Sequence, residues 1–269
     1  VIPDVSLYDH SRATAAIAAA LYLYHREKDS LTEDAVRNEA SETFLLIGGD
    51  FYGIQNYIFS DSSEARKSRS KILRGRSFAV SLICELAADM ICRAVGLPST
   101  AILLNAAGKF TIIAPNTERT RQEVAAAEEK INEWLVNVSI GENALGVSTV
   151  AAAPSDFVAG RFIAVYDRLT EAMAERKFRK FDLRCYGGVV KDFLAEFKND
   201  LRPPLCPYCG KRPSSPAAES FKAGQDDKSM CAVCRDHIFL GENIVKKNRI
   251  AITTNDAEIF DEHLCLLKP

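Results

Sequence analysis

The sequence predicts an α+β protein of 269 residues, in which a four-stranded sheet with two helices precedes a mostly helical, metal-binding region. Three observations lead to this expectation. Residues 43–150 show apolar patterns in the order strand, helix, strand, strand, helix, strand. From about residue 157 the pattern becomes helical again. Two Cys-x-x-Cys pairs then follow, at a spacing close to that of zinc sites.

The composition is that of an ordinary globular protein, 47% hydrophobic and 26% charged, which can bury a sizeable core in one or two domains. A formal net charge of -2 argues against a protein that coats nucleic acid generally. No apolar run reaches the roughly 18 residues of a membrane span, so we expect no membrane contact. The sequence begins with Val1 and shows no secretory leader, so we expect a segment of a longer chain.

Residues 1–40 predict a helical segment. An Ala-rich run at 13–25 is apolar on nearly every side, which predicts a buried helix capped by Asp9 or Ser11. Asp9 and His10 could be the remnant of a metal site. A capping Asp beside a surface His is the favoured interpretation, because a metal site needs three or more ligands.

A predicted apolar strand at 43–49 ends in Gly48-Gly49-Asp50. A carboxylate at the end of a buried strand is costly unless a cation meets it, and a divalent metal with a nucleoside triphosphate is one such partner. Backbone N–H groups in a glycine-bearing turn before a helix, here at Gly53, can hold phosphates. The alternative, that Asp50 only caps a turn or a helix, is favoured on this stretch alone, because one glycine-rich junction is a weak motif.

The remaining elements of the sheet follow in chain order. They are a basic segment at 60–76, an amphipathic helix ended by residues 96–98, strands at 101–105 and 110–114, a helix capped by residues 115–117, and a strand at 144–150. This is the βαββαβ order of ferredoxin-like folds. Both helices of that fold lie on one face of the antiparallel sheet, so we expect the opposite face to be free for a ligand or a partner.

The first strand and the hairpin are neighbours in such a sheet, so Asp50 should approach the hairpin tip at 106–109. Palm domains of polymerases and nucleotide cyclases use this place for two acids that together hold two divalent ions. The tip, Ala106-Ala107-Gly108-Lys109, carries no acid. We therefore expect this palm to bind or support a nucleotide without catalysing transfer, and we assign no catalytic residue.

Four cysteines form two knuckles in the second half of the chain: Cys206, Cys209, Cys231 and Cys234. Four soft thiolates at tetrahedral distance select Zn²⁺, and they leave no open coordination position, so the predicted zinc is structural. Two redox dithiols are the alternative, disfavoured because neither pair opens a strand-to-helix unit. The arrangement of these cysteines in two Cys-x-x-Cys pairs also favours metal binding over disulfide formation. We therefore expect the protein to be in a reducing compartment, the cytoplasm. The polar insert at 211–230 predicts a mobile loop.

Several stretches occur in a plausible order along the chain: residues 4–17, 49–59 and 70–78 and the Leu-Cys-x-x-Cys-Gly knuckle with its partner. Together they resemble the large subunit of type III CRISPR effector complexes. The type III-A (Csm) branch is the better match and the type III-B branch the second. The resemblance implies that 1–40 is the end of an HD nuclease region and a linker, 41–155 the first of two palms, and 156–269 a helical zinc-bearing domain.

In that family the second palm converts ATP to cyclic oligoadenylates when target RNA is bound, and the HD domain cuts single-stranded DNA. The resemblance implies that the first palm supports ATP with Mg²⁺ or Mn²⁺ at the palm–palm interface, that the whole protein is an enzyme, and that this segment alone is inactive. Other effector subunits, guide RNA and target RNA are the implied partners. By position, the implied nucleotide contacts are Asp50, Phe51, Tyr52, Gly53, Ile54, Gln55, Arg74 and Ser77.

Two other classes of function stay open. A stand-alone nucleotide-cyclase-like signalling enzyme would use Asp50 with a second acid, such as Asp61 or Glu64. A non-enzymatic module would instead use the sheet and the zinc-bearing region to dock other subunits. Loss of turnover on Asp50→Ala would favour the first, and the absence of any heat on titration with ATP and Mg²⁺ would favour the second.

Overall fold

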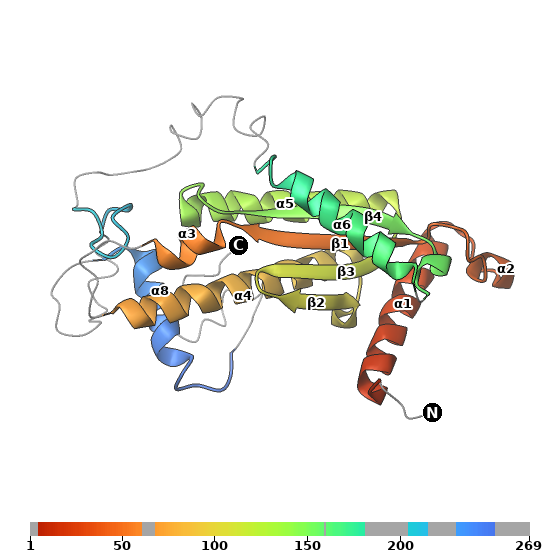
Figure 1. Cartoon of the computed structure of the whole chain (residues 1–269), viewed down its shortest axis with the longest axis horizontal. Coiled ribbons are helices and arrows are strands. Elements are labelled where there is room, and N and C mark those ends of the chain that lie inside the picture. The colour runs from red at the N-terminus through yellow and green to blue at the C-terminus, as the bar shows by residue number, and fades with distance from the viewer. Residues whose placement is uncertain (1–4, 61–67, 159, 181–203, 215–229, 251–269) are drawn as a thin grey trace. The chain divides into compact units, whose positions relative to one another are not determined.

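The structure, a computed structural model, describes residues 5–60, 68–158, 160–180, 204–214 and 230–250 (Figure 1). It divides into two compact units, one comprising residues 1–52 and 83–181 and the other residues 53–82 and 182–269. This division runs through a helix, whereas the domains that we expected at 1–40, 41–155 and 156–269 remain predictions. The apolar patterns of the sequence also predict a helix at 186–197 and a strand at 249–254. The helix lies outside the described residues, as do most of the strand and most of the insert at 211–230.

The first unit contains an antiparallel sheet in the order β2-β3-β1-β4. Its strands are β1 (Phe44–Tyr52), β2 (Ile102–Ala106), β3 (Lys109–Pro115) and β4 (Ala144–Ala152). The order and the antiparallel pairing agree with the predicted βαββαβ arrangement and with a palm-like domain. The predicted end of the first strand at residue 49 is wrong. Since both neighbouring strands pair with β1 beyond that point, Asp50 lies inside the sheet, opposite Lys109 and Gly146.

Local signals explain where these elements start and stop. The hairpin between β2 and β3 turns at Ala107 and Gly108, whose φ values of 53° and 81° are those of a type I′ turn. Helix α4 (Arg69–Val95) ends at Gly96, with φ 86°, followed by the short helix η1 (Ser99–Ala101). Helix α5 (Glu118–Ser139) begins at Thr117, whose hydroxyl accepts from the N–H of Thr120.

Side chains of α5 cover the free edge of β4. The Asn132 amide exchanges two hydrogen bonds of 2.8 Å with the backbone of Leu145, and the Glu128 carboxylate accepts from the N–H of Val147 at 2.9 Å. An uncovered edge strand would present unpaired backbone groups to other chains. The contacts therefore provide hydrogen-bond partners for backbone groups of Leu145 and Val147 at this edge, and they fix the position of α5 along β4.

The prediction that one sheet face stays free is wrong for the central strand. Every residue of β1 is buried, and since successive side chains point to opposite faces, both faces of β1 are covered. Helix α6 (Phe162–Arg176) packs on β1 and β4. It comes so close that a Cβ on Gly48 would lie 2.5 Å from the Met173 sulfur. The predicted helical segment after residue 157 thus becomes part of the palm-like unit.

Helix α1 (Leu7–Glu27) is less buried than we expected from its sequence. Its buried residues are Ala16, Ala20 and His25. The small alanines allow one narrow strip to pack, whereas Leu7, Tyr8, Ile17 and Tyr22 are exposed. The N-cap residue is Ser6, not Asp9 or Ser11. The short helix α2 (Glu33–Val36) follows, and the structure places no metal-binding cluster at Asp9 among the described residues.

The second unit contains α3 (Ile54–Phe59), the first part of α4 and α8 (Ala232–Asn243), together with the cysteine knuckles. By its basic segment at 60–76, the sequence places the start of α4 at 74–77. That prediction is wrong, because α4 already begins at Arg69, so Arg74 and Ser77 lie within the helix. Among the described residues, no helix combines the length and the apolar character that crossing a bilayer requires.

The packing of the sheet predicts that Gly49→Ala destabilises the first unit. A Cβ at this position would lie 2.1 Å from Cζ of Phe110, whose ring is fully buried and cannot move aside. We expect the free energy of unfolding to fall by roughly 1–3 kcal/mol, the usual cost of overpacking. Urea titration checks this, with Glu133→Ala on the exposed face of α5 as the control. An unchanged midpoint for Gly49→Ala would show that the sheet tolerates the extra methyl group.

Candidate functional site

Asp50 is a buried carboxylate with two lysine partners. Its side chain is 5% exposed, and its Oδ2 lies 2.9 Å from Nζ of Lys177 and 3.9 Å from Nζ of Lys109. Lys109 faces Asp50 through the β1–β3 register, and Lys177 is the C-cap residue of α6. A buried charge requires a partner of opposite sign. The chain itself supplies that partner, at the place where palm enzymes hold metal ions.

A small pocket opens above this carboxylate. Its volume is about 120 Å³, and β2, β3 and α6 contribute to its walls through Leu104, Thr111, Tyr166 and Met173. Ligand pockets for small molecules usually measure about 300–1,000 Å³. The described pocket is therefore too small to enclose a nucleotide by itself.

A second ion pair fastens the same end of α6. Arg176 donates to the Glu128 carboxylate at 2.8 Å, and Glu128 also holds the β4 edge. Burial raises the pKa of Glu128 and raises that of the neighbouring Tyr52 to about 12. The Glu128 carboxyl group and the Tyr52 phenol are thus largely removed from water. Sequence reasoning did not assign Arg176 or Lys177 to the site; two consecutive basic residues at the end of an amphipathic helix were the available signal.

The structure places the predicted nucleotide contacts in both units. Asp50, Phe51 and Tyr52 are buried in the palm-like unit, whereas Gly53, Ile54, Gln55, Arg74 and Ser77 belong to the second unit. Gly53 adopts a φ of 82°, as a left-handed residue before α3, and is exposed together with Gln55. Arg74 donates from Nε to the carbonyl of Gly241 at 3.1 Å. Contact of these residues with one ligand stays a prediction.

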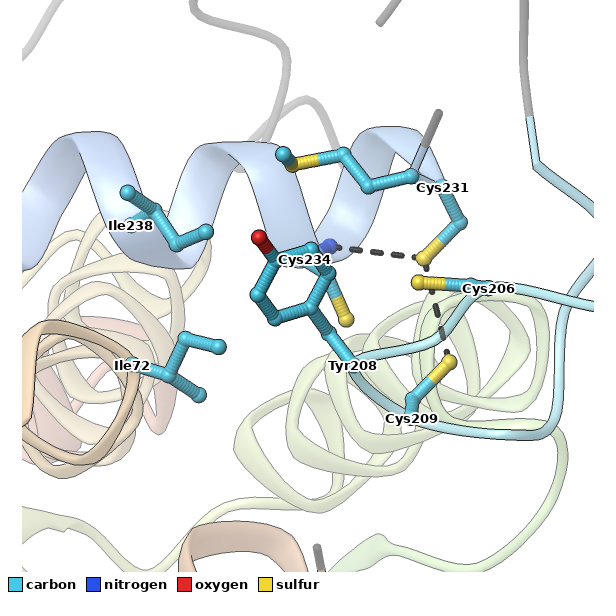
Figure 2. Close-up of a cluster of buried hydrophobic side chains, with 8 residues drawn as sticks. Ile72, Cys206, Tyr208, Cys209, Cys231, Cys234 and Ile238 are labelled. Carbon is cyan, nitrogen blue, oxygen red and sulfur yellow. Dashed lines mark hydrogen bonds between the residues drawn. The ribbon is translucent and has the colours of Figure 1, made fainter. Parts of the chain in front are cut away.

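The four predicted metal ligands come together in the second unit. All four sulfur atoms lie within 4.8 Å of one another, and those of Cys209 and Cys231 are 3.9 Å apart (Figure 2). Two sulfurs on a tetrahedral zinc with bonds of about 2.3 Å would lie roughly 3.8 Å apart, whereas a disulfide needs about 2.05 Å. The geometry therefore fits a tetrahedral ion and excludes a disulfide between these two cysteines.

Turn and helix geometry explains how the knuckles form. The backbone carbonyl of Cys206 accepts from the N–H of Gly210 at 2.8 Å, and this hydrogen bond closes the first knuckle. In the second knuckle, Cys231 is the N-cap residue of α8. Ile72, Tyr208, Met230 and Ile238 surround the sulfurs with apolar surface. Four cysteines in such an environment are the chemistry of a structural zinc centre.

Contacts among the four thiols shift their pKa values in opposite directions. Hydrogen bonding to Cys206, and then to Cys231 and Cys234, lowers the pKa of the Cys209 thiol. Hydrogen bonding to Cys206 and Cys209 raises the pKa of the Cys231 thiol. By contrast, burial raises the pKa of Cys84 and of Cys92 to about 12, with smaller contributions from the negative charges of Asp50 and Asp89, respectively. Both cysteines are the small buried hydrophobes that we predicted there.

These features define a palm-like α+β unit with a separate four-cysteine centre. A family model described as the Csm1 subunit domain B matches residues 43–193, more than half of the sequence. The chain belongs to the Csm1 family, the Cas10-type large subunits of type III CRISPR systems, and the predicted resemblance to the type III-A large subunit is confirmed.

Curated relatives carry the name CRISPR system single-strand-specific deoxyribonuclease Cas10/Csm1 (subtype III-A). The protein of Methanocaldococcus jannaschii is 31% identical over 69% of this chain and 26% of its own length. That of Thermococcus onnurineus is 31% identical over 96% of this chain and 32% of its own length. The chain thus spans about a third, or less, of these relatives.

Csm1-Csm4 cassettes are among the solved structures that this chain resembles. The cassette in complex with cA4 is 30% identical, with a TM-score of 0.58 over 71% of this chain and 25% of that chain. The apo cassette is 29% identical, with a TM-score of 0.59 over 75% of this chain and 27% of that chain.

The cysteine geometry predicts one zinc ion per polypeptide. We expect Cys209→Ser to remove most of it, because a hydroxyl is a poor substitute for a thiolate ligand. Metal content is measured by mass spectrometry on the purified protein. Cys92→Ser, a buried cysteine of α4 outside the cluster, is the control and should retain the ion. Negligible zinc in the unmodified protein would rule out the four-thiolate site.

The ion pair at Asp50 predicts that Lys177→Met destabilises the palm-like unit. We expect a loss of about 1–2 kcal/mol, below the roughly 3–5 kcal/mol of a fully buried pair, because Lys177 is half exposed. Asp50→Asn combined with Lys177→Met should recover most of this loss, since no uncompensated charge is then left. Urea unfolding measures the stability of the single and the double variant. Lys130→Met, at an exposed lysine of α5, is the control. Additive effects in the double variant would contradict the pairing.

Proposed function

We propose that this chain forms the first palm and the zinc-bearing region of a type III-A effector large subunit in RNA-guided antiviral defence. Its palm supports ATP binding for cyclic oligoadenylate synthesis by a second palm, without catalysing the reaction itself. The observation that carries the proposal is the buried Asp50 carboxylate, whose cationic partners are lysines of the same chain.

Two-metal nucleotidyl transfer requires acids that are available to divalent ions. Asp50 occupies the corresponding strand, but it would have to exchange the Lys177 ammonium for a metal. The hairpin beside it offers Ala106, Ala107 and Gly108 and no second acid, and Lys109 adds a further positive charge. A metal would therefore meet one occupied carboxylate and two cations, which is an unfavourable electrostatic setting.

The same features suit a supporting role. The pocket above Asp50 is too small for a nucleotide, as expected if the binding site is completed by another palm. ATP with Mg²⁺ or Mn²⁺ would then bind at the palm–palm interface. From this chain we propose contacts by Asp50, Phe51, Tyr52, Gly53, Ile54, Gln55, Arg74 and Ser77.

Relatives support the proposed assembly. Structures of Csm1-Csm4 cassettes exist with cA3 and with one ATP, and the curated relatives are described as single-strand-specific deoxyribonucleases. For the whole protein we propose two activities, synthesis of cyclic oligoadenylates and cleavage of single-stranded DNA. We propose the other effector subunits, guide RNA and target RNA as its partners, and a reducing cytoplasm as its location. The zinc ion at the four cysteines would be structural.

The test is Asp50→Asn in the full polypeptide that carries this sequence, assembled with guide and target RNA. We expect kcat for oligoadenylate synthesis to stay within about twofold, because Asp50 holds no catalytic metal, and KM for ATP to change more than kcat. The isolated 269 residues should form no oligoadenylate with ATP and either metal.

A loss of kcat by two or more orders of magnitude in a folded Asp50→Asn variant would overturn this assignment. It would favour instead a palm in which Asp50 is catalytic. The second acids that such an enzyme would need, Asp61 or Glu64, lie outside the described residues. Robust metal-dependent synthesis by the isolated chain would lead to the same conclusion.

A further inference from the structure

Within the second unit, a buried side chain of α3 contacts the helix that carries two of the four clustered cysteines. Tyr57 is the buried residue of α3, a helix of six residues. Its hydroxyl lies 2.9 Å from Nε2 of His237 on α8, and the two rings meet edge to face with centroids 5.5 Å apart. Both side chains are almost completely shielded from water. A helix this short is not stable alone, so its position depends on these contacts.

His237 lies on the same helix as two of the proposed metal ligands. Cys231 caps the N-terminus of α8, Cys234 belongs to its first turn, and His237 follows Cys234 by three residues. One helical turn therefore connects a sulfur ligand to the imidazole that contacts Tyr57. Any reorientation of the start of α8 on loss of the metal would move this imidazole.

Tyr57 is in turn one helical turn from Gly53. The N–H of Tyr57 donates to the Gly53 carbonyl at 2.9 Å. At the other end of α3, the buried guanidinium of Arg76 donates to the carbonyls of Ile58 and Ser60 at 3.2 and 2.5 Å. Both ends of the helix are thus fixed, while Gly53 and Gln55 remain exposed.

The two supporting helices, α4 and α8, are in backbone contact. A Cβ on Gly75 would lie 1.8 Å from the His237 carbonyl oxygen, and a Cβ on Gly241 would lie 1.9 Å from the Lys71 carbonyl oxygen. Ile72 of α4 and Ile238 of α8 also belong to the apolar cluster around the sulfurs (Figure 2). Since such packing leaves no space for adjustment, α3, α4 and α8 should respond together to the state of the cysteines.

The protonation states suit a single well-defined hydrogen bond. Burial, with the positive charges of Arg76 and Arg212, lowers the pKa of His237 to about 3, so the imidazole is neutral at pH 7. Burial raises the pKa of Tyr57 above its usual value, so the phenol keeps its proton. A neutral donor and a neutral acceptor meet without a buried charge.

We propose that Tyr57 and His237 are positioning residues, through which the four-cysteine centre holds the Gly53–Gln55 segment in its binding conformation. This inference rests on the proposed nucleotide role of that segment. It assigns to the zinc centre a second task besides stabilising its own knuckles: occupancy of the four cysteines would set the affinity for ATP.

The test uses Tyr57→Phe and His237→Gln in the full polypeptide. Tyr57→Phe keeps the ring and its packing but removes the hydroxyl, whereas glutamine at 237 retains groups that can hydrogen-bond to Tyr57. Three quantities are measured: zinc content, hydrogen exchange of the α3 amides, and the dissociation constant of a non-hydrolysable ATP analogue. Tyr8→Phe, an exposed tyrosine of α1, is the matched control.

For Tyr57→Phe we expect unchanged zinc, faster exchange confined to α3, and roughly three- to tenfold weaker binding of the analogue, the equivalent of one hydrogen bond. For His237→Gln we expect exchange rates of the α3 amides and an affinity for the analogue that lie between those of Tyr57→Phe and those of the unmodified protein. Removal of zinc by a chelator should accelerate α3 exchange while the strands of the palm-like unit stay protected, and should weaken binding in the unmodified protein more than in Tyr57→Phe.

Unchanged α3 exchange in zinc-loaded Tyr57→Phe would overturn the positioning role. Faster α3 exchange with unaltered binding of the analogue would show that the coupling exists but that Gly53–Gln55 does not bind the nucleotide, so the proposed function of this segment would fail instead. A change in global stability alone, without a change in binding or in local exchange, would also contradict the proposal.

Discussion

A carboxylate inside a strand that is buried on both faces must be neutralised, and this requirement organises the palm-like unit. Asp50 meets it with Lys177 at 2.9 Å and Lys109 at 3.9 Å. Lys177 can reach the carboxylate because α6 lies over β1. The helix can approach that closely because β1 has Gly48 beneath Met173. The ion pair between Asp50 and Lys177 therefore depends on the close packing of α6 that Gly48 permits.

The arrangement also determines how the charge of the strand acid is compensated. In a catalytic palm, divalent ions compensate the strand acid and a second acid. Here a lysine side chain compensates the one acid that is present, so the sheet does not depend on a bound metal for its electrostatic balance. The proposed supporting role follows from this substitution of an internal cation for an external one.

The second unit contains a different kind of centre. Its four sulfurs lie within 4.8 Å of one another, and its helices make backbone contact at Gly75 and Gly241. Among the described residues of this unit, the large apolar side chains that pack around the sulfurs are Ile72, Tyr208, Met230 and Ile238. A metal ion at the four cysteines would add to the order that this packing supplies. Under our proposal, the contact between Tyr57 and His237 extends that order to α3.

Much of this could be predicted from the sequence, because the determining signals are local. Period-two and helical apolar patterns gave the strand order, a left-handed Gly96 ended α4, and Thr117 capped α5. The two Cys-x-x-Cys pairs predicted that these four cysteines form one cluster able to hold a metal ion, since each knuckle is a short turn and ligand chemistry depends on residue type. The type III-A family was recognisable from the same motifs.

Tertiary structure alone decided what surrounds Asp50. Residue patterns do not reveal that β1 continues through Asp50, because strand length depends on pairing with β3 and β4. Nor do they reveal that α6 returns to the sheet, since Lys177 is 127 positions after Asp50 in the chain (177 − 50) and is brought close by packing. Tyr57 and His237 are separated by 180 positions. Their side chains meet only because α3, α4 and α8 pack together, which is a property of shape and not of local sequence.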